Sequence, residues 1–88
     1  MDPQGSEDSA TRLRRLRLRS MRRGIKEMDL LLTAFAAGLG DMGDAQVALY
    51  DRLLGENDLD LLAWVTGQRP TPAPYGDLIA RIAATPLA

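Results

Sequence analysis

The chain contains no histidine and no cysteine among its 88 residues. It therefore lacks a thiol nucleophile, a disulfide framework, the commonest general base and the usual ligands of zinc and haem. Any catalysis would depend on carboxylates, tyrosines, hydroxyls or Lys26, and no motif in the sequence gathers these groups. These absences predict a protein that is not an enzyme and that has no catalytic or metal-binding residues.

Aromatic residues are scarce, at 5% of the chain, so the core must consist mainly of aliphatic side chains, methionine and alanine. The length suits one small domain. The longest nearly apolar run, residues 30–39, is too short to cross a membrane and is interrupted by Thr33 and Gly38. We therefore expect no membrane-spanning segment.

Apolar residues recur at helical spacing in each apolar segment, and no segment alternates with the period of a strand. Glycine and proline residues separate these segments. The sequence therefore predicts an all-α fold, a small bundle of about five short helices. The expected helices span about residues 12–21, 25–37, 44–54, 58–65 and 75–84.

The first expected helix has its own detailed predictions. Ser9 or Thr11 can cap its start, because both side chains can accept a hydrogen bond from a main-chain N–H of the first turn. Leu13, Leu16 and Met21 could share its buried face. The helix should therefore pack through these three apolar side chains.

Later segments also carry specific expectations. Residues 38–43 contain three glycines and should form a flexible loop. The acidic stretch at residues 56–60 lacks the spacing of a calcium-binding loop, so we interpret it as the start of the fourth helix, capped by Asn57 or Asp58. Trp64 should be the largest core side chain.

Residues 1–9 form a polar segment that should be a disordered N-terminal tail, and residues 10–85 should form a single helical-bundle domain. The acids in the tail and its lack of an apolar run argue against a secretory signal or an organellar presequence. We therefore expect a bacterial cytoplasmic protein. A monomer is the expected state.

Charge is distributed unevenly along the chain. Residues 1–27 hold eight basic and four acidic side chains, a net charge of +4, and residues 28–88 hold three basic and eight acidic side chains, a net charge of −5. Such asymmetry favours a partner that is attracted electrostatically. It does not identify that partner.

The arginines of residues 12–23 leave a second hypothesis open, that of a small basic-armed nucleic-acid-binding or regulatory helical protein. The arm has no interleaved aromatic residues to stack on bases, and the rest of the chain is acidic. A helix lying on a membrane surface is a further alternative. Leu18 falls off the face of the other leucines, however, and no lipidation motif accompanies the arm. The simplest interpretation of the arm is a solvated basic helix.

One short motif suits docking better than catalysis. Gly24 follows the pair Arg22 and Arg23 and precedes Lys26 and Glu27. Glycine leaves the main chain bare and allows another surface to approach closely. The flanking side chains could offer hydrogen-bond donors and a carboxylate acceptor around it. The alternative is a glycine between two helices whose neighbouring charges are solvated.

The segment Arg23-Gly24-Ile25-Lys26-Glu27 matches the Arg-Gly-x-x-Glu signature of the SdhE-type flavinylation factors of succinate dehydrogenase. A second block, residues 50–65, resembles the family's later segment, in which a Leu-Leu pair precedes an acidic turn, an Asp-Leu step and a tryptophan. The resemblance covers about residues 19–82.

The resemblance implies a five-helix assembly factor that binds the flavoprotein subunit of succinate dehydrogenase, or the related fumarate reductase flavoprotein. It implies that this chaperone promotes covalent attachment of FAD to a histidine of that partner. The chain has no glycine-rich phosphate loop after a strand, so we expect that it holds no FAD stably itself. Arg23, Gly24 and Glu27 are the matched partner-binding residues, with Arg22 and Lys26 as neighbouring helpers. Arg23 could offer a bidentate fork to the partner.

Overall fold

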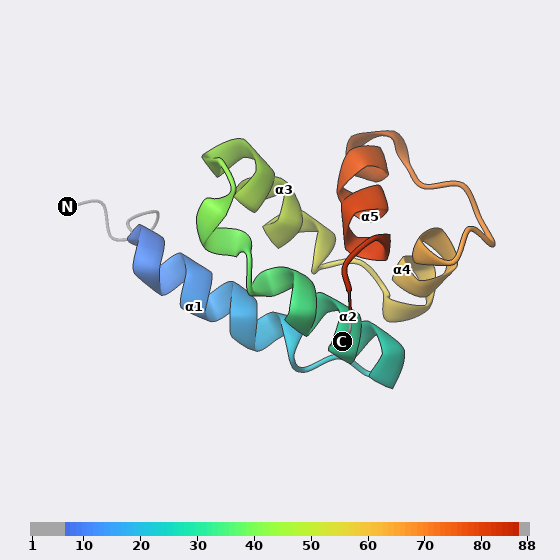
Figure 1. Ribbon diagram of the computed structural model, residues 1–88, viewed down its shortest axis with the longest axis horizontal. Coiled ribbons are helices and arrows are strands. Elements are labelled where there is room, and N and C mark those ends of the chain that lie inside the picture. The colour runs from blue at the N-terminus through green and yellow to red at the C-terminus, as the bar shows by residue number, and fades with distance from the viewer. Residues whose placement is uncertain (1–6, 87–88) are drawn as a thin grey trace.

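The computed structural model describes residues 7–86, and in this part of the chain helices follow one another without a strand (Figure 1). The predicted all-α fold class is confirmed. The α-helices are α1 (Ser9–Ser20), α2 (Lys26–Ala36), α3 (Asp44–Leu53), α4 (Asp58–Val65) and α5 (Gly76–Ala83), and the 3-10 helices are η1 (Leu39–Asp41) and η2 (Ala73–Tyr75).

Helix α2 lies at the centre of this arrangement because it packs against α1, α4 and α5. Figure 1 shows α1 and α3 toward one end of the molecule and α4 and α5 toward the other. The chain therefore returns from α3 to α4 past the corner at which α1 and α2 meet. This path brings residues of the α3–α4 turn next to the α1–α2 corner.

The core follows the helical periodicity of the sequence. Among residues 7–86, sixteen buried hydrophobic residues come from every α-helix, from both 3-10 helices and from the end of α3. Helical spacing predicts an inner face of Val47, Tyr50, Leu53 and Leu54 for α3 and of Leu78, Ile79 and Ile82 for α5, and all of these residues are buried. For α2 it predicts Ile25, Met28, Leu31, Leu32 and Phe35, of which Met28, Leu32 and Phe35 are buried. The large members are Leu16, Met28, Leu32, Phe35, Leu39, Val47, Tyr50, Leu53, Leu54, Leu61, Tyr75, Leu78, Ile79 and Ile82.

A small polar network crosses this core. The hydroxyl groups of Ser20 and Tyr50, both fully buried, lie 2.6 Å apart. Ser20 Oγ also donates to the carbonyl of Leu16 at 2.7 Å, and the Tyr50 hydroxyl lies 3.4 Å from the carbonyl of Leu32. Buried hydroxyls need such partners, and here the partners join α1, α2 and α3. Burial raises the pKa of Tyr50 to about 12.

Helix α1 departs from its prediction at both ends. It begins at Ser9 and is capped by Asp8, whose Oδ1 accepts from the main-chain N–H of Thr11 at 2.8 Å. The predicted caps, Ser9 and Thr11, are therefore wrong, because an aspartate one residue earlier provides the acceptor. Met21 was predicted to face the core, but it lies beyond the last helical turn and is 51% exposed.

The glycine-rich segment was also predicted incorrectly as a flexible loop. Its central residues form η1, whose Leu39 is fully buried and fixes the turn in the core. Trp64 is half-buried and packs against Tyr75, whereas Tyr50 is the largest fully buried side chain. Asn57 caps α4, as predicted, by accepting from the N–H of Leu59.

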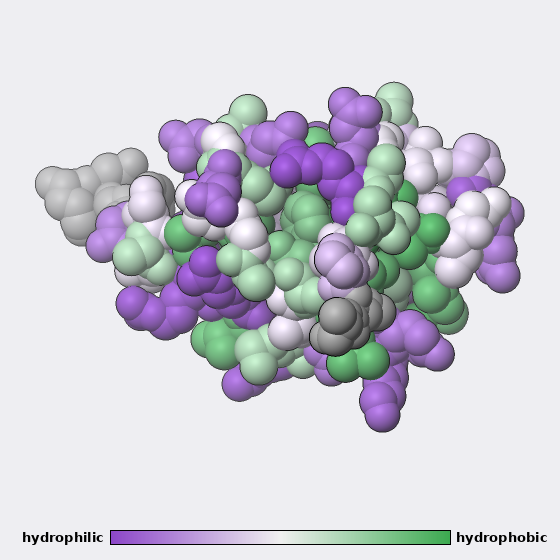
Figure 2. Space-filling view, viewed as in Figure 1, coloured by the Kyte–Doolittle hydropathy of each residue, from purple (hydrophilic) through white to green (hydrophobic). Residues whose placement is uncertain are grey.

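The predicted disordered tail spans residues 1–9, of which residues 1–6 lie outside the part that the structure describes. Residue 9 is already helical. Within the described residues, no helix has the length and apolar character needed to span a bilayer. Figure 2 shows hydrophilic side chains over much of the visible face, with hydrophobic side chains between them.

Candidate functional site

The Arg-Gly-x-x-Glu motif occupies the corner between α1 and α2. Helix α1 ends at Ser20, and the N–H of the next residue, Met21, donates to the carbonyls of Arg17 and Leu18. The chain is then extended at Ile25, whose carbonyl accepts from the N–H of Asp29 to start α2. The corner thus leaves the motif glycine outside any helix, with main chain accessible on the surface.

Arg23 is the best-anchored side chain of the motif and is only 9% exposed. Its Nε donates to Asp58 Oδ1 at 2.7 Å, and its Nη2 lies 2.6 Å from the same oxygen. Its two terminal nitrogens also donate to the carbonyls of Leu54 and Glu56, at 3.1 and 3.4 Å. The guanidinium of Arg23 therefore holds the end of α3 and the first turn of α4 next to the corner.

Gly24 is held by the same carboxylate. Its main-chain N–H donates to Asp58 Oδ2 at 2.8 Å, so one aspartate binds the side chain of Arg23 and the backbone of Gly24. A Cβ placed on Gly24 would lie 3.4 Å from Asp58 Oδ2, and the glycine has no positive φ. The backbone here does not require glycine, so the residue's contribution is the bare surface it leaves.

The other predicted partner-binding residues surround this corner on the surface. Arg22, Lys26 and Glu27 are all exposed. Glu27 lies in the first turn of α2, where an acid is favoured by the helix dipole. Within the described residues, Glu27 forms no ion pair, so its carboxylate faces solvent.

The five predicted residues therefore form one contiguous corner, but they divide into two groups. The surface group, which is exposed and available to a partner, consists of Arg22, Gly24, Lys26 and Glu27. Arg23 was expected to offer its fork to a partner, but that fork is already engaged by Asp58 and two carbonyls. These bonds of Arg23 hold the corner in place. Direct contact of Arg23 with a partner stays a prediction.

Sequence reasoning did not identify Asp58 as part of this site. It was considered only as a possible cap of α4, a role that Asn57 fills. Asp58 is 35 residues from Arg23 in the chain, so no local pattern connects them. Its place in the acidic turn of the second resembling block was the one available signal.

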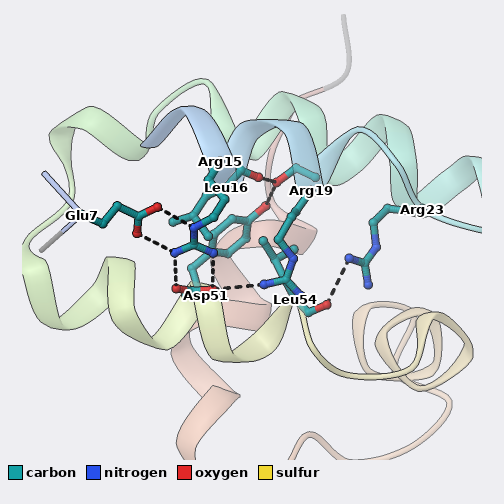
Figure 3. A network of polar contacts seen from close by, with 9 residues as sticks. Glu7, Arg15, Leu16, Arg19, Arg23, Asp51 and Leu54 are labelled. Atoms are coloured by element: carbon teal, nitrogen blue, oxygen red, sulfur yellow. Dashed lines mark hydrogen bonds and ion pairs between the residues drawn. The ribbon is translucent and has the colours of Figure 1, made fainter. Parts of the chain in front are cut away.

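A second network of charges ties α1 to α3 beside the corner (Figure 3). Arg15 donates to both carboxylate oxygens of Asp51, at 3.1 and 2.8 Å, and Arg19 donates to Asp51 Oδ1 at 3.1 Å. Arg15 also binds Glu7, at 2.8 and 3.0 Å. The hydrogen bond from Arg15 lowers the pKa of both Asp51 and Glu7.

Arg15, Arg19 and Arg23 are spaced four residues apart, so they form one row along α1 and its continuation. Figure 3 shows all three side chains reaching from this row toward α3. The arginine arm was interpreted as a solvated basic helix, and for this row that interpretation is wrong. Long guanidinium arms attach α1 to the acidic part of the chain.

Comparison with known proteins identifies the family of this chain. A family model described as flavinator of succinate dehydrogenase matches residues 14–86. The chain belongs to this family. The match includes the complete Arg-Gly-x-x-Glu corner together with Asp51 and Asp58, so the resemblance stated from two short blocks is confirmed over most of the chain.

Named members of the family are similar over the same region. The chain is 42% identical over 79 residues to succinate dehydrogenase assembly factor 2, mitochondrial, of Drosophila virilis, which covers 86% of this chain and 50% of that protein. It is 46% identical over 71 residues to the protein of the same name from Aspergillus terreus, covering 76% of this chain and 24% of that protein. The chain thus spans about half the length of the fly relatives that it matches, and less of the fungal one.

The expected bacterial cytoplasmic location is contradicted by these relatives. Their names place them in mitochondria, and they come from flies and a fungus. The lack of a presequence-like pattern in residues 1–8 was therefore an insufficient basis for predicting the cellular compartment.

Proposed function

We propose that this chain binds the flavoprotein subunit of succinate dehydrogenase and promotes covalent attachment of FAD to it. The flavoprotein of fumarate reductase is a related second partner in this proposal. Family membership supports a role in succinate dehydrogenase assembly. The single structural observation that supports docking at the motif is the clamp that Asp58 forms on Arg23 and Gly24.

This clamp matters because it fixes the shape of the corner before any partner arrives. A surface that is already ordered loses less conformational entropy when it binds. Gly24 then presents bare main chain, and Glu27 and Lys26 present one charge of each sign beside it. A partner loop can approach the glycine closely and bind both charges.

The chemistry of flavin attachment belongs to the partner in this proposal. The chain has neither histidine nor cysteine, so it offers no usual nucleophile for a covalent flavin bond. It would act by binding one conformation of the flavoprotein more tightly than the others, which shifts the population toward the reactive form. The protein is then a chaperone and not an enzyme.

FAD itself is expected to stay on the partner. The chain has no glycine-rich phosphate loop that follows a strand. A groove of about 460 Å³ lies along α1, but it is lined by arginines, Thr11 and Leu18, with no aromatic ring to stack on an isoalloxazine. We therefore propose that the chain holds no FAD stably and works as a monomer against a single flavoprotein.

The direct test mixes purified apo flavoprotein subunit, FAD and a dicarboxylate, with or without this chain. Covalent flavin is read as fluorescence of the denatured flavoprotein on a gel. We expect the chain to raise the rate or yield of covalent flavin on the flavoprotein alone. Covalent flavin on this chain, or tight FAD binding in the absence of the flavoprotein, would contradict the chaperone mechanism.

A further inference from the structure

Helix α1 and the short segment that follows it carry a second row of side chains next to Arg15, Arg19 and Arg23. Arg14, Leu18 and Arg22 are spaced four residues apart, one position before each member of the first row. All three are exposed, and Leu18 has 45% of its surface accessible. An apolar side chain thus lies between two positive charges along the outer side of α1 and the segment after it.

The two rows enclose the groove of about 460 Å³ already noted along α1. Among residues 7–86 its lining consists of Thr11, Leu18 and five arginines, without an acidic side chain. The groove ends at Arg22 and Arg23, so it is continuous with the corner that carries the Arg-Gly-x-x-Glu motif. Any partner bound at that corner lies next to a strongly positive channel.

The arginines of the two rows differ in how fully they are engaged. Arg15 and Arg19 share Asp51, and Arg23 binds Asp58. Arg14 and Arg22 form no ion pair with any residue from 7 to 86. The acidic residues of α3 and α4 therefore fix the inner wall of the groove, and the outer wall keeps its positive charge.

The chain itself shows which chemical group the groove accepts. Glu7, just before α1, places both carboxylate oxygens on Arg15, at 2.8 and 3.0 Å, on the side of the guanidinium that Asp51 does not occupy (Figure 3). Glu7 is thus an intramolecular carboxylate ligand at the margin of the groove. The site is partly solvent-exposed, so an outside carboxylate can replace it.

We infer that the α1 groove, lined by Arg14, Arg15, Leu18, Arg19 and Arg22, docks an acidic segment of the partner protein that also carries an apolar side chain. The segment's carboxylates pair with Arg14 and Arg22, and its apolar side chain covers Leu18. Under the proposed function, on which this inference rests, that segment belongs to the succinate dehydrogenase flavoprotein. Glu7 competes with it for Arg15.

Charge complementarity favours an acidic peptide over a nucleic acid here. Single-stranded nucleic acids are bound by basic grooves that contain aromatic side chains for base stacking. The groove lining has none, and its centre is the aliphatic Leu18.

The test compares two charge reversals in the full chain, Arg14→Glu in the groove and Arg81→Glu on α5 as the matched control. Both arginines are exposed, and the variants have the same net charge. Calorimetry with apo flavoprotein subunit at low and high salt gives the dissociation constants. We expect Arg14→Glu to weaken binding about tenfold or more, because like charges across an interface repel. Arg81→Glu should change it less than about threefold, as expected for a charge outside the contact.

The identity of the docked segment is read by photo-crosslinking. A benzophenone amino acid replaces Leu18 in one variant and the exposed Ala48 of α3 in the control. Mass spectrometry of the crosslinked flavoprotein should find an Asp- and Glu-rich peptide attached at position 18 alone. A peptide with no excess of acidic residues, or equal crosslinking at position 48, would overturn the inference.

Glu7→Gln provides a second test, in which we expect the affinity for the flavoprotein to rise and not to fall. Removal of the competing carboxylate should tighten flavoprotein binding several-fold at low salt, and Asp77→Asn on α5 should leave it unchanged. Weaker binding by Glu7→Gln would contradict the view that Glu7 and the partner share one site. Thermal melts of all variants establish that they are folded.

The outcomes separate this inference from the proposed function. If Gly24→Arg abolishes flavoprotein binding while Arg14→Glu and Arg81→Glu behave alike, the proposed function stands and the groove inference fails. If the wild-type chain does not bind the flavoprotein, the proposed function fails. The groove is then tested by NMR with a peptide of alternating glutamate and leucine.

In that NMR titration, saturable shifts at Leu18 that Arg14→Glu removes support an acidic-peptide groove. Absence of shifts overturns it. A single-stranded oligonucleotide serves as the other probe. If Arg14→Glu weakens oligonucleotide binding but not binding of the flavoprotein or the peptide, the groove is a nucleic-acid surface and the inference is wrong.

Discussion

The carboxylate of Asp58 accepts a hydrogen bond from the main-chain N–H of Gly24 at 2.8 Å, although the two residues are 34 positions apart in the chain. The same carboxylate binds Arg23. One acidic side chain at the start of α4 therefore fixes both the position of the Gly24 backbone and the conformation of the Arg23 side chain. This relationship makes the stability and the docking function of the motif experimentally separable.

Gly24→Arg should abolish flavoprotein binding and leave the fold intact. The glycine is exposed, its φ is not positive, and a Cβ would meet only Asp58 Oδ2 at 3.4 Å, so a long side chain extends into solvent over the docking face. Gly43→Arg is the matched control, since a Cβ at Gly43 meets nothing within 4 Å. Circular dichroism should be unchanged for both, and only Gly24→Arg should stop flavinylation.

Arg23→Ala and Glu27→Ala should both impair flavinylation, but for different reasons. Loss of the nearly buried guanidinium removes a charge-assisted network and should lower the free energy of unfolding by about 2–3 kcal/mol. Glu27 is exposed, and its loss should cost less than about 1 kcal/mol. Urea unfolding measures the difference. If Arg23→Ala were as stable as wild type, the clamp by Asp58 would not support the corner.

Asp51→Asn should destabilise the attachment of α1 to α3. The pairs that Asp51 forms with Arg15 and Arg19 are partly exposed, so we expect a loss of only about 1 kcal/mol at low salt, shrinking as salt rises. Chemical denaturation at two salt concentrations checks this, with Asp77→Asn as the control. A loss that is independent of salt would mean that Asp51 acts through packing.

The depressed pKa of Asp51 gives the same variant a pH signature. The hydrogen bond from Arg15 lowers the pKa of Asp51 in the folded chain, so the unfolded chain binds the proton more tightly. The stabilisation by Asp51 is therefore fully present above its ordinary pKa of 3.8 and is lost as the pH falls below that value toward its folded pKa. The stability curves of wild type and Asp51→Asn should converge in this acid range.

Tyr50→Phe should change stability in the alkaline range. The folded pKa of Tyr50 is raised to about 12 from an ordinary value of 10.0, so stability from its neutral form is present below pH 10 and is lost as the pH rises through 12. The wild type should lose about 2–3 kcal/mol in this range from Tyr50 alone, which Tyr50→Phe should not lose. Absorbance at 295 nm follows the titration. Normal titration of Tyr50 in the folded chain would contradict its burial.

Much of the fold could be predicted because it depends on local periodicity. The apolar spacing in α2, α3 and α5 identified the buried side chains, and glycine or asparagine identified several helix ends. Asp8 was missed as the cap of α1 because Asp8, Ser9 and Thr11 lie close together in the sequence and each could accept a hydrogen bond from the first turn. The 3-10 turn at Leu39 was missed because three surrounding glycines suggested a loop, whereas burial of one leucine decides the conformation.

The site was predictable only in part. The motif residues were found from the resemblance, but the partners that hold them were not. Arg15, Arg19 and Arg23 have a visible four-residue spacing, yet their acceptors in α3, in α4 and in the turn between them lie 31 to 36 positions away. Twelve acidic residues are available in the chain, and periodicity does not select among them. That selection is made by the tertiary packing, which brings the end of α3 and the start of α4 next to the end of α1.

The chain's single tryptophan, Trp64, lies on α4, the helix that begins with Asp58. Its ring centroid is 5.8 Å from that of Tyr75, and it is half-buried against the core. The fluorescence emission of Trp64 therefore depends on how α4 packs against Tyr75 and the core. The protein thus contains an intrinsic optical reporter on the helix that clamps the motif, and changes at the corner can be followed by fluorescence without an added label.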